Sequence, residues 1–221
     1  HGETTDQITA DSSGCYSVQV TEPTSGCTVE AKMQVKICGD RDPNANINKY
    51  VVGWYFGNGA GVLFNGSADN PKDTTGGLVV PEGVAKMTDP TNSLIFYTDG
   101  QKIFDRNNNP IYAVGDTTKR LNGDLTNAQG VTVIPKTSCK GCQAEYYVFT
   151  LSKNSKGENL LYYSIVDMKL NKGKGGISVL NQLVSPVPAT SRLLASEGGQ
   201  GFYWLVVQDM NSSNTRTYKI S

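Results

Sequence analysis

An aromatic strand signal that repeats along the chain constrains the fold more than any other feature. Runs rich in aromatic and β-branched residues begin at Leu94, Tyr146 and Phe202, with spacings of 52 and 56 residues. Shorter runs of the same kind flank each of them, separated by Gly, Asn, Asp, Ser and Pro. No sustained helical spacing of apolar residues is present. The pattern therefore predicts an all-β chain of short strands joined by turns.

The runs group into three similar units. Their strands are predicted at 84–87, 94–97 and 102–104; at 130–134, 146–149, 160–166 and 177–184; and at 192–195, 202–207 and 217–220. A period near 50 residues with several strands per unit is typical of β-propeller blades. We therefore predict part of a β-propeller, about three blades, over residues 50–221. A β-sandwich is the alternative, although it does not account for the repeated aromatic strand.

The first 39 residues have a different organisation. Gly14–Thr21 and Cys27–Ile37 are predicted to form one hairpin, and a lone hairpin is at best marginally stable. We therefore expect residues 1–39 to be the C-terminal strands of an Ig-like domain and residues 40–49 to be a polar linker. An open stack of three blades would leave sheet edges exposed. We accordingly expect the chain to be a fragment of a longer protein, or to be completed by another chain.

The five cysteines bear on both the compartment and the hairpin. They lie in turn-like contexts, at Cys15, Cys27, Cys38, Cys139 and Cys142, which suits an oxidising compartment. Regular hairpin pairing would place Cys15 opposite Lys32, about five residues or roughly 17 Å from either Cys27 or Cys38. A disulfide spans at most about 7 Å between Cα atoms. We therefore expect at least one of these three to pair with a cysteine upstream.

Several stretches resemble a known group of proteins. The runs are Trp54–Asn65 (WYFGNGAGVLFN), Ile95–Gly100, Val133–Lys136, Tyr146–Thr150 and Tyr163–Met168. They resemble the propeller-like region of large surface proteins exported by type IX secretion in gliding bacteria. The upstream runs Ser13–Thr21 and Ser25–Thr28 resemble the end of an Ig-like or polycystic-kidney-disease-type repeat. The resemblance implies a secreted or cell-surface location and a role in adhesion, motility or surface display. It brings no catalytic residues.

Composition and charge exclude several classes of function. Twenty basic and 20 acidic residues give zero net charge, so the basic excess of a nucleic-acid binder is missing. No run approaches the roughly 20 apolar residues of a membrane helix. The single histidine, His1, argues against Ser-His-Asp or Cys-His catalysis and against most histidine-based zinc sites.

The C-x-x-C pair Cys139 and Cys142 lies in a loop between two predicted strands. A thioredoxin-like site would need a helix to follow, and a zinc site would need two further ligands. We predict a small disulfide that staples this loop, with free thiols or zinc as alternatives.

Two polar runs have the oxygen spacing of a calcium site. Asp105, Asn107 and Asn109 match positions 1, 3 and 5 of a calcium loop and Asp116 matches position 12, but the expected Gly and Glu are missing. The alternative is an Asn-rich turn. The linker alternates oxygen-bearing side chains in the same way, and the alternative there is a solvated linker. These linker residues are Asp40, Asp42, Asn44, Asn46 and Asn48.

Paired carboxylates can hydrolyse glycans without histidine when they face each other about 5–9.5 Å apart. The candidates are Glu82, Asp89, Asp99, Glu197 and Asp209. Most lie beside Gly, Asn or Pro, where turn capping is the alternative. The sequence therefore favours a non-catalytic binding or display module with a protein or glycan ligand and no cofactor beyond calcium. The alternatives are a glycan-binding or glycan-cleaving propeller and a structural spacer in a surface assembly.

Overall fold

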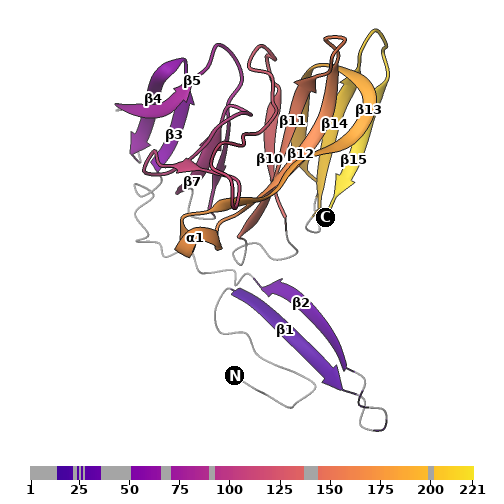
Figure 1. Cartoon of the computed structure of the whole chain (residues 1–221). Coiled ribbons are helices and arrows are strands. Elements are labelled where there is room, and N and C mark those ends of the chain that lie inside the picture. Colours follow the sequence, from indigo (N-terminus) through magenta and orange to yellow (C-terminus); the bar gives the residue numbers. More distant parts are fainter. Residues whose placement is uncertain are drawn as a thin grey trace.

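The computed structural model describes residues 14–21, 24, 26, 28–35, 51–65, 71–89, 93–136, 144–198 and 202–221. The described chain is almost entirely β and forms four antiparallel sheets (Figure 1), which confirms the all-β prediction. The only helical element, α1 (Leu170–Gly173), contains Asn171 and Lys172 in left-handed conformations, so it is a tight turn in shape. None of the described helical residues forms a segment long and apolar enough to cross a membrane.

The N-terminal hairpin pairs β1 (Gly14–Thr21) with β2 (Thr28–Val35). Its register differs by two residues from the sequence prediction. Val20 lies opposite Val29, and Cys15 lies opposite Gln34 rather than Lys32. The shift arises because the first cross-strand pair is Thr21 with Thr28. Cys27 and Cys38 lie outside the described residues, and their pairing stays a prediction.

A three-stranded sheet follows, formed by β3 (Val51–Phe56), β4 (Asn58–Asn65) and β5 (Lys72–Val79). Gly57 and Gly59 make the β3–β4 turn with positive φ angles of 58° and 68°, which side chains disfavour. The ring of Tyr55 points inward and stacks on Tyr97 of the next sheet, with centroids 4.2 Å apart. This stack joins the two sheets.

The first predicted unit forms its own sheet. Its four strands run in chain order as β6 (Ala85–Thr88), β7 (Leu94–Thr98), β8 (Ile103–Asp105) and β9 (Pro110–Ile111). Phe96, Tyr97 and Ile103 of β7 and β8 are each at most 1% exposed, while the other apolar residues of these two strands are half-buried. The strand positions predicted for this unit are confirmed to within a few residues.

The second and third predicted units are not separate. They form one six-stranded sheet in chain order, with strands β10 (Val131–Pro135), β11 (Glu145–Lys153), β12 (Asn159–Asp167), β13 (Gly176–Glu197), β14 (Tyr203–Asp209) and β15 (Thr215–Ile220). No closed sheet is formed by the described strands.

The two units merge because β13 is 22 residues long and serves both neighbours. Its first part pairs with β12 and its last part pairs with β14, and Ala189 has a partner on each side. Pro186 and Pro188 lie inside this strand. Four register shifts against β12 accompany the pairing, which is how a bulged strand bends.

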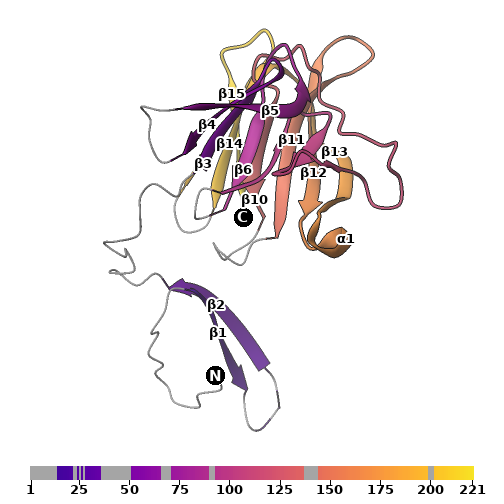
Figure 2. The ribbon, with the colours of Figure 1, turned by 90° about the vertical axis from the view of Figure 1, so that its left-hand side faces the viewer.

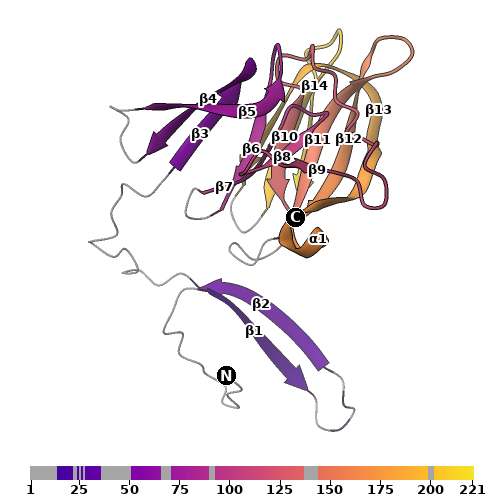
Figure 3. The ribbon, with the colours of Figure 1, turned by 60° about the vertical axis from the view of Figure 1, so that its left-hand side comes forward.

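The connection between β9 and β10 fastens the sheets together. Its beginning pairs with the start of β13, where the Ile177 N–H donates to the Tyr112 carbonyl at 2.9 Å. Its end pairs with the later part of β13, where the Leu193 N–H donates to the Gln129 carbonyl at 3.0 Å. Figures 1 and 3 show the sheets β3–β5, β6–β9 and β10–β15 side by side, with β3–β5 at one end and β13–β15 at the other. Figure 2 views the β3–β5 end.

Candidate binding surface

The predicted calcium loop is a turn between β8 and β9. Hydrogen bonds between the residues of the loop close this turn. The Asp105 Oδ1 accepts hydrogen bonds from the backbone N–H groups of Asn107 and Asn109, both at 2.8 Å. The other carboxylate oxygen accepts one from the Asn109 side-chain amide at 3.1 Å. These bonds account for the Asp and Asn residues as turn-forming groups. A calcium role for the loop stays a prediction.

Asn108, the remaining asparagine of this turn, ties two sheets together. Its φ of 62° lies in the left-handed region, which asparagine tolerates. Its side-chain amide donates to the Thr75 carbonyl of β5 at 3.1 Å, and its oxygen accepts the Tyr97 hydroxyl of β7 at 2.6 Å. The same hydroxyl accepts the Gly77 N–H at 2.8 Å. The turn thus has a clear structural role.

Asp116, predicted as the twelfth calcium position, is engaged in a turn of its own. Its carboxylate accepts both the hydroxyl and the N–H of Thr118, at 2.6 Å and 2.9 Å. The hydrogen bond from the Thr118 hydroxyl is the main cause of a lowered pKa at this carboxyl. In the part of the chain that the structure describes, no three His, Cys, Asp or Glu side chains form a group that could hold a metal ion.

The predicted ligands of the linker calcium site and the cysteines of the predicted loop disulfide lie outside the described ranges. They are the linker residues Asp40, Asp42 and Asn44 and the loop cysteines Cys139 and Cys142. A linker calcium site and a loop disulfide therefore stay predictions.

Two of the candidate catalytic carboxylates cap turns. The Asp89 Oδ1 accepts the Ser93 N–H at 2.9 Å. The Asp99 Oδ1 accepts the N–H groups of Gln101 and Lys102 at 2.7 Å and 2.6 Å, and this side chain is nearly buried. Both carboxylates therefore hold backbone in place, as the capping alternative predicts.

A third candidate carboxylate, Asp209, pairs with an arginine of the neighbouring strand. The Arg216 guanidinium contacts the Asp209 carboxylate and the Ser185 hydroxyl, and it donates to the Val187 carbonyl at 3.0 Å and the Tyr218 hydroxyl at 3.2 Å. These bonds fasten β13, β14 and β15 to one another. Asp209 thereby has a structural partner.

The same three strands present a regular outward face. Cross-strand pairing aligns Ser196, Trp204 and Lys219 in one row, and it aligns Leu194, Val206 and Thr217 in the next. Because side chains alternate along a strand, the residues two positions further along lie on the same face. We call this surface the Trp204 face, and its nine residues are Arg192, Leu194, Ser196, Trp204, Val206, Gln208, Thr215, Thr217 and Lys219. Eight of them are exposed and Val206 is half-buried.

The opposite side of these strands belongs to the core. Leu193, Leu205 and Val207 are at most 2% exposed and pack in one apolar cluster. The sheet is therefore amphipathic, with one face packed and one face in solvent.

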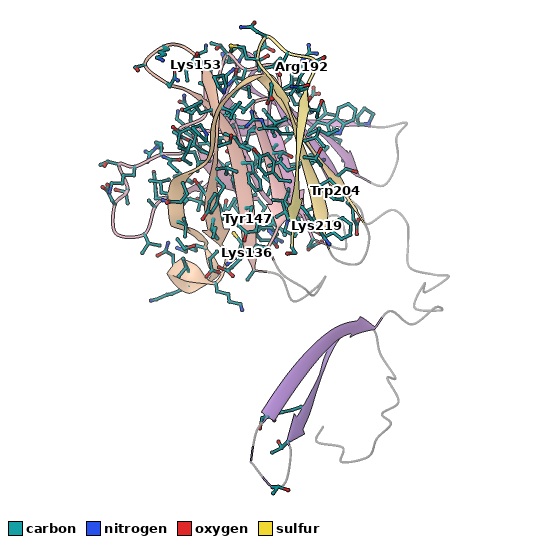
Figure 4. The ribbon with its side chains drawn as sticks, turned by 90° about the vertical axis from the view of Figure 1, so that its right-hand side faces the viewer. Lys136, Tyr147, Lys153, Arg192, Trp204 and Lys219 are labelled. Carbon is teal, nitrogen blue, oxygen red and sulfur yellow. The ribbon has the colours of Figure 1, made fainter. Side chains whose placement is uncertain are left out.

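An aromatic corner holds Trp204 in position. Its indole is 38% exposed and meets the ring of Phe202 edge-on, at a centroid distance of 5.3 Å and an angle of 86°. The Lys219 ammonium lies 4.4 Å from the centre of the same Phe202 ring, which is a cation–π contact. Figure 4 shows Trp204 and Lys219 close together, with Arg192 toward the other end of the strands.

A second exposed aromatic pair lies at the far end of the molecule. On β3, Trp54 is 56% exposed and Phe56 is 45% exposed, while Tyr55 between them points inward. Pairing through Val62 places Asp73 on the same outward face. This face therefore carries an acidic residue, which the Trp204 face lacks.

The sequence located the strands of the Trp204 face but not the face itself. The alternation of Trp204, Val206 and Gln208 with buried Leu205 and Val207 is the signal that identifies it. That alternation assigns the aromatic residue to solvent only once its strand partners are known. Searches of family models, curated proteins and solved structures found no match to this chain.

Proposed function

We propose that the chain is a non-catalytic binding and display module of a secreted or cell-surface protein that acts in adhesion or surface motility. The Trp204 face is the observation that carries the binding function. A packed sheet supports it from behind, an exposed indole is held at its corner, and hydrogen-bonding side chains lie elsewhere on the same face.

Three of the five candidate carboxylates are engaged in structural contacts, which favours binding over catalysis. Asp89 and Asp99 serve turns, and Asp209 serves an ion pair between strands. A glycosidase needs one carboxyl that can donate a proton and a second that faces it across the substrate. Groups already bound to backbone N–H or guanidinium are poorly prepared for either role.

The finer architecture is part of the same proposal. We regard the sheets β3–β5, β6–β9 and β10–β15 as parts of a propeller and β1–β2 as the end of an Ig-like domain. Consecutive antiparallel sheets packed side by side support the first assignment. The surface location and the export route rest on the resemblance of the WYFGNGAG region and on the cysteine contexts.

The binding function is tested by measuring retention and turnover on the same ligands. Purified chain is applied to immobilised polysaccharides and extracellular proteins, and release of reducing ends is measured in parallel. We expect retention on at least one ligand without release of reducing ends. Release that is abolished by Asp99→Asn or Asp209→Asn would instead establish the glycan-cleaving alternative.

The location is tested separately on intact cells of the source organism. An antibody against the chain is expected to label intact cells, or to detect the protein in the medium. Labelling that appears only after lysis would contradict the surface assignment.

A further inference from the structure

We propose that the Trp204 face binds acidic polysaccharides, whose chains carry carboxylate or sulfate groups. This inference rests on the proposed binding function and names its ligand class. The first observation is charge. Arg192 and Lys219 are the only charged residues among the nine on this face, and both are basic. The whole chain carries no net charge, so the local excess does not follow from composition. An anionic chain is the complementary ligand.

The second observation is the aromatic corner. The face of an indole carries partial negative charge, which attracts the weakly positive C–H side of a sugar ring. Trp204 offers 38% of its surface, and the edge-on contact with Phe202 restricts its rotation. Restricting the indole before the ligand arrives lowers the entropy lost on binding.

The third observation is the hydrogen-bonding character of the remaining residues. Ser196, Gln208, Thr215 and Thr217 are exposed and supply hydroxyl or amide groups. Only Leu194, Trp204 and Val206 of the nine are apolar. These three residues adjoin one another on β13 and β14, and the other six residues of the face are polar or charged. A membrane-binding surface instead needs a broad apolar face that enters the lipid. A face with mixed hydroxyl groups and one aromatic corner fits a hydrated polymer better.

The dimensions also suit a polymer. Arg192 and Ser196 are four residues apart on β13, which is about 13 Å of strand. Lys219 lies in the row of Ser196 but two strands away, which adds about 10 Å across the sheet. The Cα atoms of Arg192 and Lys219 are therefore about 16 Å apart along the diagonal. A chain with repeated charges can span both residues.

The test measures the affinity of the full chain for polygalacturonate and chondroitin sulfate by affinity electrophoresis. Dextran serves as the neutral polymer and phosphatidylglycerol vesicles serve as the lipid surface. We expect binding to both acidic polymers, weakened as NaCl rises from about 0.05 M to about 0.5 M. Neither dextran nor the vesicles should be bound.

Substitutions locate the site. We expect Trp204→Ala to weaken binding about tenfold, and Lys219→Gln and Arg192→Gln about threefold each. Trp54→Ala and Lys156→Gln are the matched controls. They remove an exposed tryptophan and an exposed lysine elsewhere, and they should leave the affinity unchanged. Unchanged urea midpoints for all five variants exclude unfolding as the cause.

Three results would overturn the inference. The first is a failure to bind acidic polymers, and the second is an affinity for dextran equal to that for the acidic polymers. The third is an equal loss of affinity in Trp54→Ala and Trp204→Ala. Vesicle binding that Trp204→Ala removes would assign the face to lipid instead. If another ligand is retained while the acidic polymers are not, the ligand class is wrong and the binding function stands. Release of reducing ends would contradict the binding function itself.

Discussion

Replacing Tyr97 with phenylalanine probes the junction between the three-stranded and four-stranded sheets. The ring of Tyr97 is fully buried and stacks on Tyr55. Its hydroxyl donates to the Asn108 side-chain oxygen at 2.6 Å and accepts the Gly77 N–H at 2.8 Å. Phenylalanine keeps the ring and removes only these two hydrogen bonds. The substitution therefore isolates the polar part of the junction.

We expect Tyr97→Phe to lower the free energy of unfolding by about 2 kcal/mol. Each lost hydrogen bond contributes about 1 kcal/mol net, and both former partners belong to partly buried contacts. Urea unfolding monitored by tryptophan fluorescence measures the loss. With an m-value of about 2 kcal/mol per M, the midpoint should fall by about 1 M. The m-value itself should not change.

Tyr55→Phe is the matched control because it removes a hydroxyl from the other ring of the same stack. The described structure gives that hydroxyl no hydrogen bond, so the free energy of unfolding should change by less than about 0.5 kcal/mol. Equal losses in the two variants, or a loss below about 0.5 kcal/mol for Tyr97→Phe, would refute the argument. The junction would then depend on ring packing alone.

Three further substitutions test other parts of the fold. Asn127→Ala removes a buried reciprocal amide pair with Asn159, at 2.9 Å and 3.1 Å, and should cost about 2 kcal/mol in urea unfolding. Gly61→Ala should cost about 1–3 kcal/mol by the same assay, because its Cβ would lie 2.7 Å from a neighbouring side chain. A hydrogen bond from the Thr126 hydroxyl lowers the pKa of Asp124 below 3.8, so its carboxylate stabilises the fold above that pH. At neutral pH the parent chain should therefore be more stable than Asp124→Asn. This difference should shrink as the pH falls below about 3.8, and urea midpoints measured across pH follow it.

Much of the strand layout follows from local sequence. The aromatic runs at Leu94, Tyr146 and Phe202 all become strands, and their turn residues mark the ends. These features depend on period-two patterning and on turn chemistry, both of which act over a few residues. Local rules were sufficient to place these individual strands.

The grouping of strands into sheets depends on which strands pair with each other. The prediction that the second and third units are separate was wrong, because their strands form one sheet. Separate strands were predicted at 177–184 and 192–195, whereas β13 runs through both segments and through Pro186 and Pro188 between them. Proline is tolerated within a strand where its missing N–H is not needed by a neighbour. Whether that condition holds depends on the partners of β13, which no local pattern contains.

The candidate site residues show the same limit. Asp105, Asn107 and Asn109 match a calcium loop by spacing, yet their oxygens and N–H groups close a turn. Both structures require oxygen-bearing side chains at alternate positions, so spacing cannot separate them. Trp204 was predicted only as part of the strand at 202–207, because the identity of a strand does not reveal which of its faces is covered.

Because side chains alternate along β14, the residues that stabilise the fold lie on one face of the strand. The residues proposed to bind a ligand lie on the other face. Leu205 and Val207 point into the core, and Trp204 and Gln208 on either side of them point to solvent. A substitution on the outer face therefore changes what the sheet presents without opening a cavity behind it. The Arg216–Asp209 pair strengthens this separation because it joins the three strands from outside the set of nine face residues. A module built in this way can alter its ligand while its fold remains constant, which suits the binding and display function that we propose.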